Sequence, residues 1–585
     1  MANLTTTWRG IVRNQMRSLP ILDLYDYYDF SFNIKERASE IRNLLLKAKY
    51  KASSPLIVKL EKRYGICRHV MVPSPSDALI FQTITEELAP SIIRRQPTSK
   101  AFYSRDKQTL KLPHQVAQSR YPWFILWPKY QKNILKFTNN CDYLVVTDVS
   151  DYYDNIGLRE LRHIVSSYSK TQEVILDLLF NIIEQLAWNP DYLPTSLKGL
   201  PQIDIEAFRL LPHAMLFETD KLLNKQTNGN FVRWMDDINF GVDTKDEAFT
   251  ILGNLNDALK TRGLALNISK TEIYTASEAK EHFLFDENKY LDQVLATSTA
   301  ATNFQQVKSD FLKRFRAHLG KSKLMNWDKV TKRYFTVAAH FKFTELRPYV
   351  YDLFVQAPST RSHILSYLGH LKFSKNTAAI LLSLINSVKR YDDVTLFELC
   401  KLITEIQIPH TPTGIEFVKN VNKVLKEYAT DFDLFCYFWF LAKYGAPYII
   451  MNLIQKTKER WRNEPFLARE VMSILPRLLR FNQPATLRLL DEQARIGTIN
   501  ASSVANSLNS IIKIERLSGH TKYIFPPKPQ KPFPLPKYLI LTAFLSSRNL
   551  MPSEKTSLVN KVNTHVSDQW YLYWLKNIPF YESEV

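Results

Sequence analysis

The chain has 585 residues, which predicts two or three packed units, and its 45% apolar content indicates a globular protein. Its 77 Lys and Arg against 57 Asp and Glu give a net charge of +20, which favours a polyanionic partner, first of all nucleic acid. An anionic membrane surface is the alternative, but the sequence shows no basic amphipathic anchor and no lipidation signal.

The first twenty residues lack the apolar core of a signal peptide, and the most apolar run, 434–442, is far shorter than a membrane span. Four scattered cysteines form no CxxC pair and no zinc-ligand cluster, which indicates a reducing compartment. They are Cys67, Cys141, Cys400 and Cys436. The sequence therefore predicts a cytoplasmic protein with no membrane partner.

Residues 141–290 mix two kinds of hydrophobic pattern. The segments DYLVVTDV and FVRWMDDINFGV are strand-like, whereas DEAFTILGNLNDALKTRG has helical spacing that ends near Gly263. The pattern is typical of an α+β region.

Acidic residues follow these predicted strands. Asp148 ends the first strand, and Asp236 and Asp237 lie between the two apolar runs of the second segment. Carboxylates at the ends of neighbouring strands build two-metal sites, in which two Mg²⁺ or Mn²⁺ ions activate an attacking hydroxyl and stabilise the leaving oxygen. A strand-end cap is the commoner role for Asp148 alone, and a turn is the commoner place for an Asp-Asp pair. Their combination favours the metal site.

Two further segments carry candidate ligands for a polyanion. In SLKGLPQIDIEAF, a turn at Gly199 and Pro201 opens a helix, and Gln202 is placed to contact a base or template strand. In LALNISKTEIY, Lys270 follows a strand-like run and is placed to reach a phosphate. Either residue by itself is more often a solvated surface group.

From about residue 300, apolar residues recur at helical spacing in short segments, and strand signals nearly vanish. Successive helices with brief connections predict an α-solenoid of HEAT-like pairs, although no strict sequence period is present. The segment 525–537 contains six prolines and predicts a stiff surface loop before a last helical piece. Binding of a partner by its extended form is the alternative.

Two basic segments flank the acids. Residues 311–335 interleave nine Lys, Arg and His residues with five aromatic rings at helical spacing, which suits either a thumb or product channel, or a helix pair with buried rings. The five rings are Phe311, Phe315, Trp327, Tyr334 and Phe335. Residues 94–115 are basic and loop-like, and predict an insertion that faces nucleic acid.

Four segments together resemble the palm motifs of reverse transcriptases. DVSDYYDNI resembles motif A, GLPQ motif B, WMDD the YxDD motif C and LNISKTEI motif D, in the family's order and within about 125 residues. Upstream, YGICRHVMVPSPSDALIFQTITEELAP resembles the fingers segment that meets the incoming triphosphate. The polymerase resemblance covers roughly residues 46–290.

The resemblance implies a role for each matched residue. Asp148, Asp236 and Asp237 become the metal-binding acids, with the backbone of Val149 as a second-metal ligand. Lys270 matches the motif D lysine that helps to protonate the pyrophosphate leaving group. Tyr153 matches the position that screens the sugar 2′-hydroxyl, where a bulky ring favours deoxynucleotides. Arg68 is the candidate that binds the triphosphate, with Lys62 and Arg63 as alternates.

Two positions depart from the family pattern. Trp234 replaces the usual tyrosine of motif C, which keeps an aromatic surface and leaves the acids intact. Ile203 replaces the glycine that normally follows PQ in motif B, with Asp204 next, and puts ordinary accommodation of template and nucleotide in question.

A palm with an altered motif B before a long helical region resembles the abortive-infection and unknown-group reverse transcriptases of bacterial antiphage defence. This resemblance implies DNA synthesis from dNTPs, in several members without a conventional template and with a protein hydroxyl as primer, so that the DNA product is covalently attached. Tyr25, Tyr27 and Tyr28 are near the N-terminus, but buried packing aromatics are the more common case and no primer site is assigned.

The implied fold is that of a right-hand polymerase, α+β fingers and palm followed by an all-α, HEAT-like region. We expect an N-terminal extension at 1–45, fingers and palm at 46–290, a basic thumb-like connection at 291–345 and a helical domain at 346–585. Solenoid tails often self-associate, which favours a homo-oligomer. The alternatives are a template-directed enzyme of retron or group II intron type, which would also bind RNA, and a non-catalytic nucleic-acid-binding scaffold.

Overall fold

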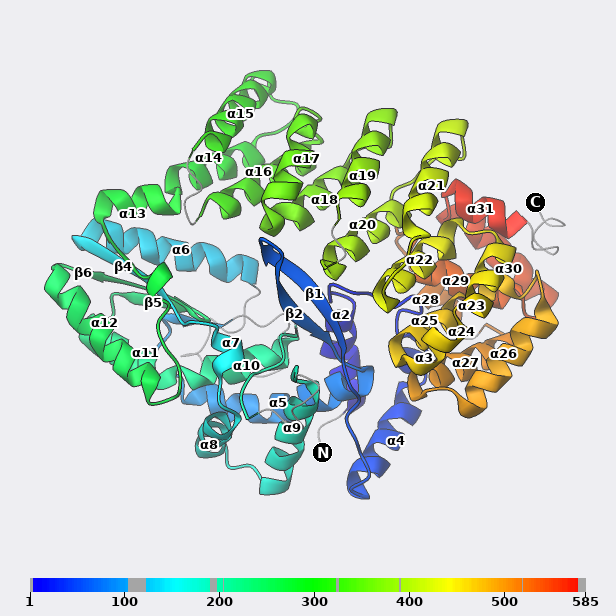
Figure 1. The fold of residues 1–585 in the computed structure, drawn as a ribbon, viewed down its shortest axis with the longest axis horizontal. Coiled ribbons are helices and arrows are strands. Elements are labelled where there is room, and N and C mark those ends of the chain that lie inside the picture. The colour runs from blue at the N-terminus through cyan, green and yellow to red at the C-terminus, as the bar shows by residue number, and fades with distance from the viewer. Residues whose placement is uncertain are drawn as a thin grey trace.

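The computed structural model describes residues 4–103, 123–189, 197–203, 205–321, 326–388, 391–517 and 519–576. Figure 1 shows a β-sheet with its helices at one end of the molecule and a mass of helices at the other, with a two-stranded hairpin between them. The predicted strands around residues 143 and 231, and the helical character after residue 300, are confirmed.

The N-terminal helices lead into the hairpin. They are α1 (Leu4–Thr7), the π-helix η1 (Trp8–Val12), α2 (Arg13–Met16), α3 (Tyr28–Phe32) and α4 (Ile34–Leu46). The antiparallel strands β1 (Leu56–Arg63) and β2 (Ile66–Val72) turn at Tyr64 and Gly65, whose φ angles are 55° and 80°. A two-residue turn with both φ angles positive matches the twist of a hairpin, and glycine adopts such an angle without steric cost.

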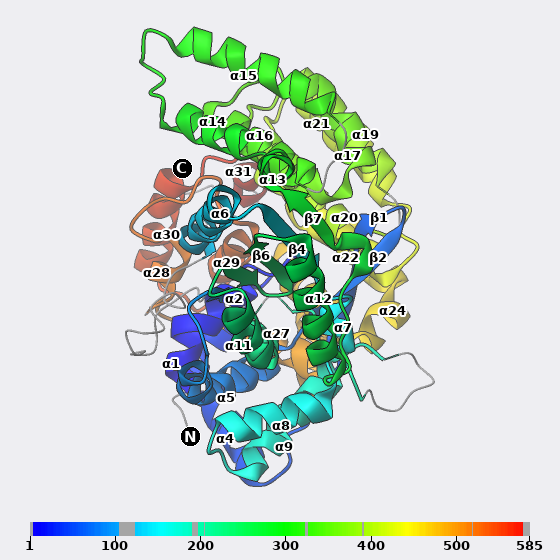
Figure 2. The same cartoon turned by 90° about the vertical axis from the view of Figure 1, so that its left-hand side faces the viewer.

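The central sheet has five strands in the order β3-β5-β6-β4-β7. They are β3 (Ala101–Phe102), β4 (Tyr143–Asp148), β5 (Phe231–Trp234), β6 (Asp237–Val242) and β7 (Glu272–Thr275). Strands β4, β5, β6 and β7 pair antiparallel, and β3 pairs parallel to β5. Helices lie on both faces, with α6 and α13 on one and α11 and α12 on the other (Figure 2). Strands β4, β5 and β6, covered on both faces, bury most of their side chains, which explains their continuous apolar runs, whereas β7 at the edge of the sheet stays accessible.

The sheet and hairpin are surrounded by ten helices and one short 3₁₀ turn within the described residues. These are α5 (Pro75–Arg94), α6 (Trp123–Asn140), α7 (Tyr152–Asn155), α8 (Leu158–Tyr168), α9 (Glu173–Leu186), α10 (Glu206–Met215), α11 (Phe217–Gln226), α12 (Lys245–Lys260), η3 (Ile268–Lys270), α13 (Ala276–Phe283) and α14 (Phe285–Ala296). Ser74 caps α5 and is followed by a proline, while Thr244 and Glu247 form a capping box on α12. Both devices satisfy the free N–H groups that a helix start exposes.

The helical region runs from residue 304 to residue 576. Its elements are α15 (Phe304–Leu319), α16 (Trp327–Phe341), α17 (Arg347–Gln356), η4 (Pro358–Thr360), α18 (Arg361–His370), α19 (Lys375–Ser387), α20 (Asp393–Glu405), α21 (Pro412–Leu425), α22 (Asp431–Tyr444), α23 (Pro447–Lys456), α24 (Lys458–Asn463), α25 (Pro465–Ile474), η5 (Leu475–Leu478), α26 (Gln483–Ile496), α27 (Ile499–Ile512), α28 (His520–Ile524), α29 (Leu535–Leu545), α30 (Pro552–His565) and α31 (Gln569–Lys576).

Helices of this region stack in two rows. Helices α16, α18, α20 and α22 contact one another in succession, and α17, α19 and α21 do the same (Figure 1). Each helix therefore buries one side against the next helix but one, as in a solenoid. No helix in the described parts of the chain has the length and apolarity that a bilayer crossing requires.

Three sequence expectations are tested by these elements. Lys270 ends a 3₁₀ turn before β7, and the strand-like run ahead of it makes a single antiparallel bridge, Leu266 with Val149, instead of a full strand. The five rings between residues 311 and 335 are all buried, which excludes base stacking by them and leaves only the cations for nucleic acid. The segment 525–534 forms no helix or strand, as its prolines predict, and α29 follows it. Most of the basic segment 94–115, from residue 104 on, lies outside the described residues.

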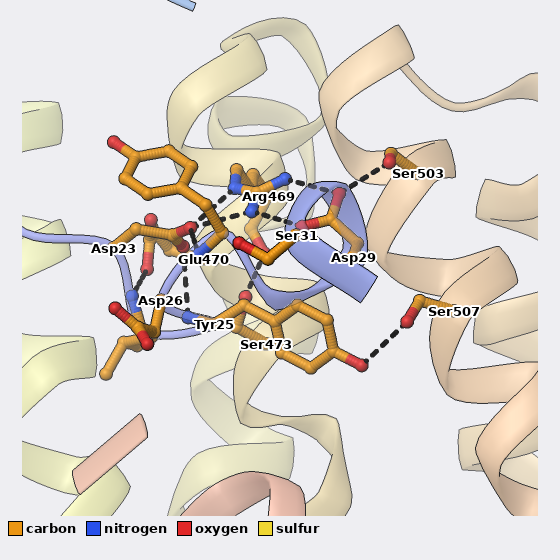
Figure 3. Close-up of polar contacts among 12 residues, drawn as sticks. Asp23, Tyr25, Asp26, Asp29, Ser31, Arg469, Glu470, Ser473, Ser503 and Ser507 are labelled. Carbon is orange, nitrogen blue, oxygen red and sulfur yellow. Dashed lines mark hydrogen bonds and ion pairs between the residues drawn. The ribbon is translucent and has the colours of Figure 1, made fainter. Parts of the chain in front are cut away.

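The N-terminal segment is clamped into the helical region by one buried arginine. Arg469 on α25 donates to Asp23 at 2.6 Å and to Asp29 at 2.8 Å, and all three side chains are nearly inaccessible (Figure 3). Tyr25 and Tyr28 are buried beside this cluster and bond Ser507 and His520. Tyr27 is buried as well. All three N-terminal tyrosines are therefore packing residues in this structure.

We expect Arg469→Met to destabilise the protein by about 3–5 kcal/mol, because the change leaves two buried carboxylates without their counter-charge. The free energy of unfolding is measured by urea denaturation. The matched control is Lys401→Met, which removes an exposed i,i+4 pair with Glu405 and should cost at most about 1 kcal/mol. Equal losses in the two variants would contradict the clamp.

Candidate active site

Three acids meet where β4 ends beside the β5–β6 hairpin. Asp148 is the last residue of β4 and is the direct cross-strand partner of Asp237, the first residue of β6. Cross-strand partners project from the same face of a sheet, so these two carboxylates lie side by side. Asp236 belongs to the two-residue turn, and its carbonyl accepts a hydrogen bond from the backbone N–H of Val149 at 3.4 Å. The structure thus brings together the predicted acids and Val149.

The loop that carries Lys270 is tied to the same strand end. The backbone N–H of Asn267 donates to the carbonyl of Asp148 at 2.7 Å, and that of Ser150 donates to Ala265 at 2.8 Å. These bonds place the Lys270 ammonium in an ion pair with one carboxylate oxygen of Asp148. About half of the lysine side chain remains exposed, so it can also contact a solute.

The charges at this edge are not balanced. The other oxygen of Asp148 is buried and has no hydrogen-bond partner among the described residues. Burial, together with the negative charges of Asp237 and Asp148, raises the pKa of Asp236 to about 7. Burial raises the pKa of Asp237 as well, although Lys329 opposes the shift. Lys270 and Lys329 offset only part of this negative charge.

Hard oxygen donors with unmet positive charge fit divalent cations such as Mg²⁺ or Mn²⁺. Within the described ranges, however, no three acidic, histidine or cysteine side chains converge in a complete metal-binding geometry. Lys270 holds one oxygen of Asp148 in this arrangement. The carboxylate oxygens therefore fit two divalent cations by their chemistry. A cation at Asp148 would have to replace Lys270 on the oxygen that this lysine holds.

Arg233 is a site residue that the sequence analysis missed. It is fully buried on β5, pairs with Asp220 of α11 through two bonds of 2.6 Å, and donates to the carbonyl of Met235 at 2.7 Å. Met235 has a φ of +53°, an uncommon angle for a residue with a side chain. Arg233 thus fixes the turn that presents Asp236. Its signal was an arginine inside an otherwise apolar strand.

Lys329 is a second missed residue, within the basic segment whose general role was predicted. It lies on α16, its ammonium is 5.2 Å from the ring centre of Trp127, and its charge opposes the rise that burial causes in the pKa of Asp237. It lines a small cavity of about 40 Å³ beside Asp148 and Asp237. It also lines a cavity of about 880 Å³ that extends past Trp234 to Lys332, Arg333 and Arg209.

The β1–β2 hairpin presents two of the three triphosphate candidates to the acids. Leu60 pairs with Arg68, and a bulge between Glu61 and Arg63 places Lys62 close to that pair. The pKa of Lys62 is lowered by partial burial and then by Arg68, while Asp151 acts in the opposite direction. Lys62 therefore lies between Arg68 and motif A. Arg63 instead packs over the Tyr64 ring at the tip, 4.5 Å from its centre.

The same hairpin is fastened to the helical region. Arg361 of α18 donates to Glu61 of β1 at 2.8 Å and to Asp392 at 2.5 Å, and all three side chains are almost fully buried. Glu61 also accepts the backbone N–H of Gly65 at 2.8 Å, which braces the turn. The position of the hairpin is thus set from a helix about 300 residues later in the chain.

The motif B segment lies beside motif A. The side chain of Gln202 donates to Asp154 at 3.1 Å, and its carbonyl accepts the backbone N–H of Met71 on β2 at 3.2 Å. Ile203 is buried, with 6% of its surface exposed. Tyr153 is half-buried, 5.8 Å from the Tyr152 ring. Asp204 lies outside the described residues.

Comparisons with known proteins agree with this geometry. Residues 96–370 match the family model of reverse transcriptase (RNA-dependent DNA polymerase), a span that includes the sheet, the three acids and Lys270 but not the β1–β2 hairpin. No curated protein matches the chain.

Remote likenesses to solved structures were also found. Apo telomerase from Candida tropicalis is 11% identical, with a TM-score of 0.31, over 74% of this chain and 73% of that one. The telomerase of Candida tropicalis in complex with a TWJ fragment of telomeric RNA is 11% identical, with a TM-score of 0.27, over 67% and 68%. The corresponding Candida albicans complex is 10% identical, with a TM-score of 0.29, over 68% and 66%.

The raised pKa of Asp236 predicts a pH dependence of stability without metal. Between pH 4 and about 7 the folded protein keeps a proton that the unfolded chain has lost, so stability falls as the pH rises and is lowest above about pH 7. In a chelator, we expect Asp236→Asn to gain on the order of 1–2 kcal/mol over wild type when the pH rises from about 5.5 to about 8. Thermal unfolding at the two pH values measures this, and parallel profiles would contradict it.

Proposed function

We propose that this chain, a nucleotidyltransferase of the RNA-directed DNA polymerase class, makes DNA from dNTPs at the edge of the sheet where Asp148, Asp236 and Asp237 meet. The observation that carries the proposal is the meeting of these three acids inside the matched domain, where one buried oxygen of Asp148 has no hydrogen-bond partner among the described residues and the pKa of Asp236 is raised. In the reaction, a hydroxyl attacks the α-phosphate of a dNTP and pyrophosphate leaves.

The three acids and the Val149 backbone carbonyl would hold two divalent cations, which supply activation of the attacking hydroxyl and stabilisation of the leaving oxygen. Lys270 is close enough to exchange its bond with Asp148 for one with the leaving pyrophosphate, to which it can give a proton. Its half-exposed side chain supports that exchange. Arg233 keeps Asp236 in place through the turn backbone.

We assign the triphosphate to Lys62 and Arg68, because the charges of Arg68 and of Asp151 and Asp154 in motif A all act on Lys62. Tyr153, half-buried beside the acids, is the candidate that screens the sugar, and Gln202, held by Asp154, is the candidate contact to a base. The cavity of about 880 Å³ next to Trp234, with Lys329 and other cations in its wall, would hold the DNA strand.

The finer proposal is an antiphage polymerase of the abortive-infection type that works without a conventional template and starts from a protein hydroxyl. The buried Ile203 in motif B and the two-row helical region support it. A HEAT-like tail that self-associates belongs to the same proposal. The division into an N-terminal extension, fingers and palm, thumb-like connection and helical domain is proposed on the same basis.

Loss of the paired acids tests the reaction itself. We expect Asp236→Ala with Asp237→Ala to lower dNTP incorporation on the order of a thousandfold in Mg²⁺ or Mn²⁺, because charge stabilisation in the transition state is removed. The control pair is Asp243→Ala with Asp246→Ala, two exposed acids just beyond the same hairpin, which should incorporate at the wild-type rate. Wild-type incorporation by the paired-acid variant would falsify the site.

The product distinguishes the finer alternatives. DNA of a sequence unrelated to any added RNA, which enters the aqueous phase only after proteolysis, supports template-free, protein-primed synthesis. DNA that copies an added or associated RNA instead favours an enzyme of retron or group II intron type. Phage plaque counts on cells that carry the wild-type protein or the Asp236→Ala, Asp237→Ala variant test the defence role. If defence requires polymerisation, the variant should no longer protect the cells.

The buried pairs of Arg361 predict a kinetic effect at long range. Because they fix the hairpin that carries Lys62 and Arg68, we expect Arg361→Gln to raise KM for dNTP about fivefold or more with kcat changed less than about twofold. Arg361→Lys should recover part of the loss, and Arg495→Gln, an exposed change on α26, should have no effect. An unchanged KM in a folded Arg361→Gln protein would contradict the role.

A further inference from the structure

A second large cavity lies in the helical end of the molecule, away from the three acids. Its volume is about 950 Å³, within the range of sites that bind small molecules. Three parts of the chain enclose it: the N-terminal segment 13–27, helices α18, α20 and α22, and the proline-rich segment 526–537. None of the proposed catalytic residues is in its wall.

The acids in this wall already have partners. Asp26 accepts from Arg17 at 2.7 Å and from the hydroxyl of Tyr523, and Asp23 is held by Arg469 at 2.6 Å. Glu405 is 3.9 Å from Lys401. These contacts engage part of the negative charge of the wall, and Asp26 also acts on Arg13 and Lys537.

Two further cations of the wall, Arg13 and Lys537, form no ion pair among the described residues, although the charge of Asp26 acts on both. Arg13 has a buried Nε with no hydrogen-bond partner among the described residues, and both burial and the nearby charge of Arg17 lower its pKa. Lys537 donates only to the amide of Gln530, at 2.7 Å, and burial lowers its pKa to about 8. Both cations are partly buried, and a bound anion that contacts both would offset the cost of that burial.

The rest of the wall is aromatic and apolar. The Tyr523 ring lies under both Lys537, at 5.4 Å, and Arg17, at 6.0 Å, so one face of the cavity joins a ring to the positive charge. Phe533, Trp439 and four prolines of segment 526–537 complete the surface. Rings next to cations suit a ligand with a base at one end and a phosphate at the other.

We propose that this cavity binds a nucleotide, with its phosphate between Arg13 and Lys537 and its base against Tyr523 and the proline-rich segment. The ligand is a free nucleoside phosphate or the terminal nucleotide of a DNA strand, which present the same chemistry. The proposal does not depend on polymerase activity, because the cavity shares no residue with the catalytic site.

Binding is tested in the full chain with Asp236→Ala and Asp237→Ala, in a chelator, so that the polymerase site holds no metal. Calorimetry with dATP, with inorganic pyrophosphate and with a 5′-phosphorylated oligothymidylate distinguishes the free nucleotide from the strand end. We expect one site per chain for dATP or the oligonucleotide, with affinity at least tenfold weaker after Arg13→Gln with Lys537→Gln.

The matched control is Arg516→Gln with Lys528→Gln, which removes two exposed cations outside the cavity and should leave the affinity unchanged. If the double cavity variant does not fold, Lys537→Gln alone is measured. Lys537 is only half-buried in the first turn of α29, so this single change should leave the fold intact. Absence of binding by every probe, or equal binding by cavity and control variants, overturns the proposal.

Discussion

The mutual repulsion of three carboxylates is the constraint on which the rest of this structure depends. Two unit charges about 4 Å apart repel by about 4 kcal/mol at the effective dielectric of a protein surface, and Asp148, Asp236 and Asp237 meet within two adjacent strand ends. The raised pKa of Asp236 is the visible result. The acids remain in place because they belong to a rigid antiparallel ladder whose strands are covered on both faces.

Positively charged side chains lie on two sides of the acids. Beneath the hairpin, Arg233 and Asp220 form a fully buried pair that fixes the turn without touching the carboxylates. On the open side, Lys270 pairs with Asp148 directly, and Lys329 reaches Asp237 from a helix of the next region. Both lysines can move, since both are largely exposed, whereas the buried arginine cannot. The side chains that hold the acids in place are thus rigid, whereas the two lysines on the open side can change their contacts.

The helical region acts on this site from two directions. It holds the β1–β2 hairpin through Arg361 and the N-terminal segment through Arg469. Each of these arginines belongs to a buried ion-pair cluster. Buried pairs fix geometry more than they add stability, because desolvation offsets most of their attraction. Through Arg361, a helix far away in sequence sets the position of the hairpin that carries Lys62 and Arg68.

Local pattern alone determined the strands around Asp148 and Asp236, the helical second half and the loop at 525–534, since alternation, helical spacing and proline act over a few residues. It also indicated the acids, because like charges next to buried strands need a reason. Only the tertiary structure decided that Lys62, rather than Arg63, lies beside Arg68, that the rings of residues 311–335 are buried, and that Arg233, Lys329 and Arg361 serve the site. Those outcomes depend on the side of a strand or helix from which a side chain projects and on contacts between residues hundreds of positions apart. Local periodicity of the sequence determines neither.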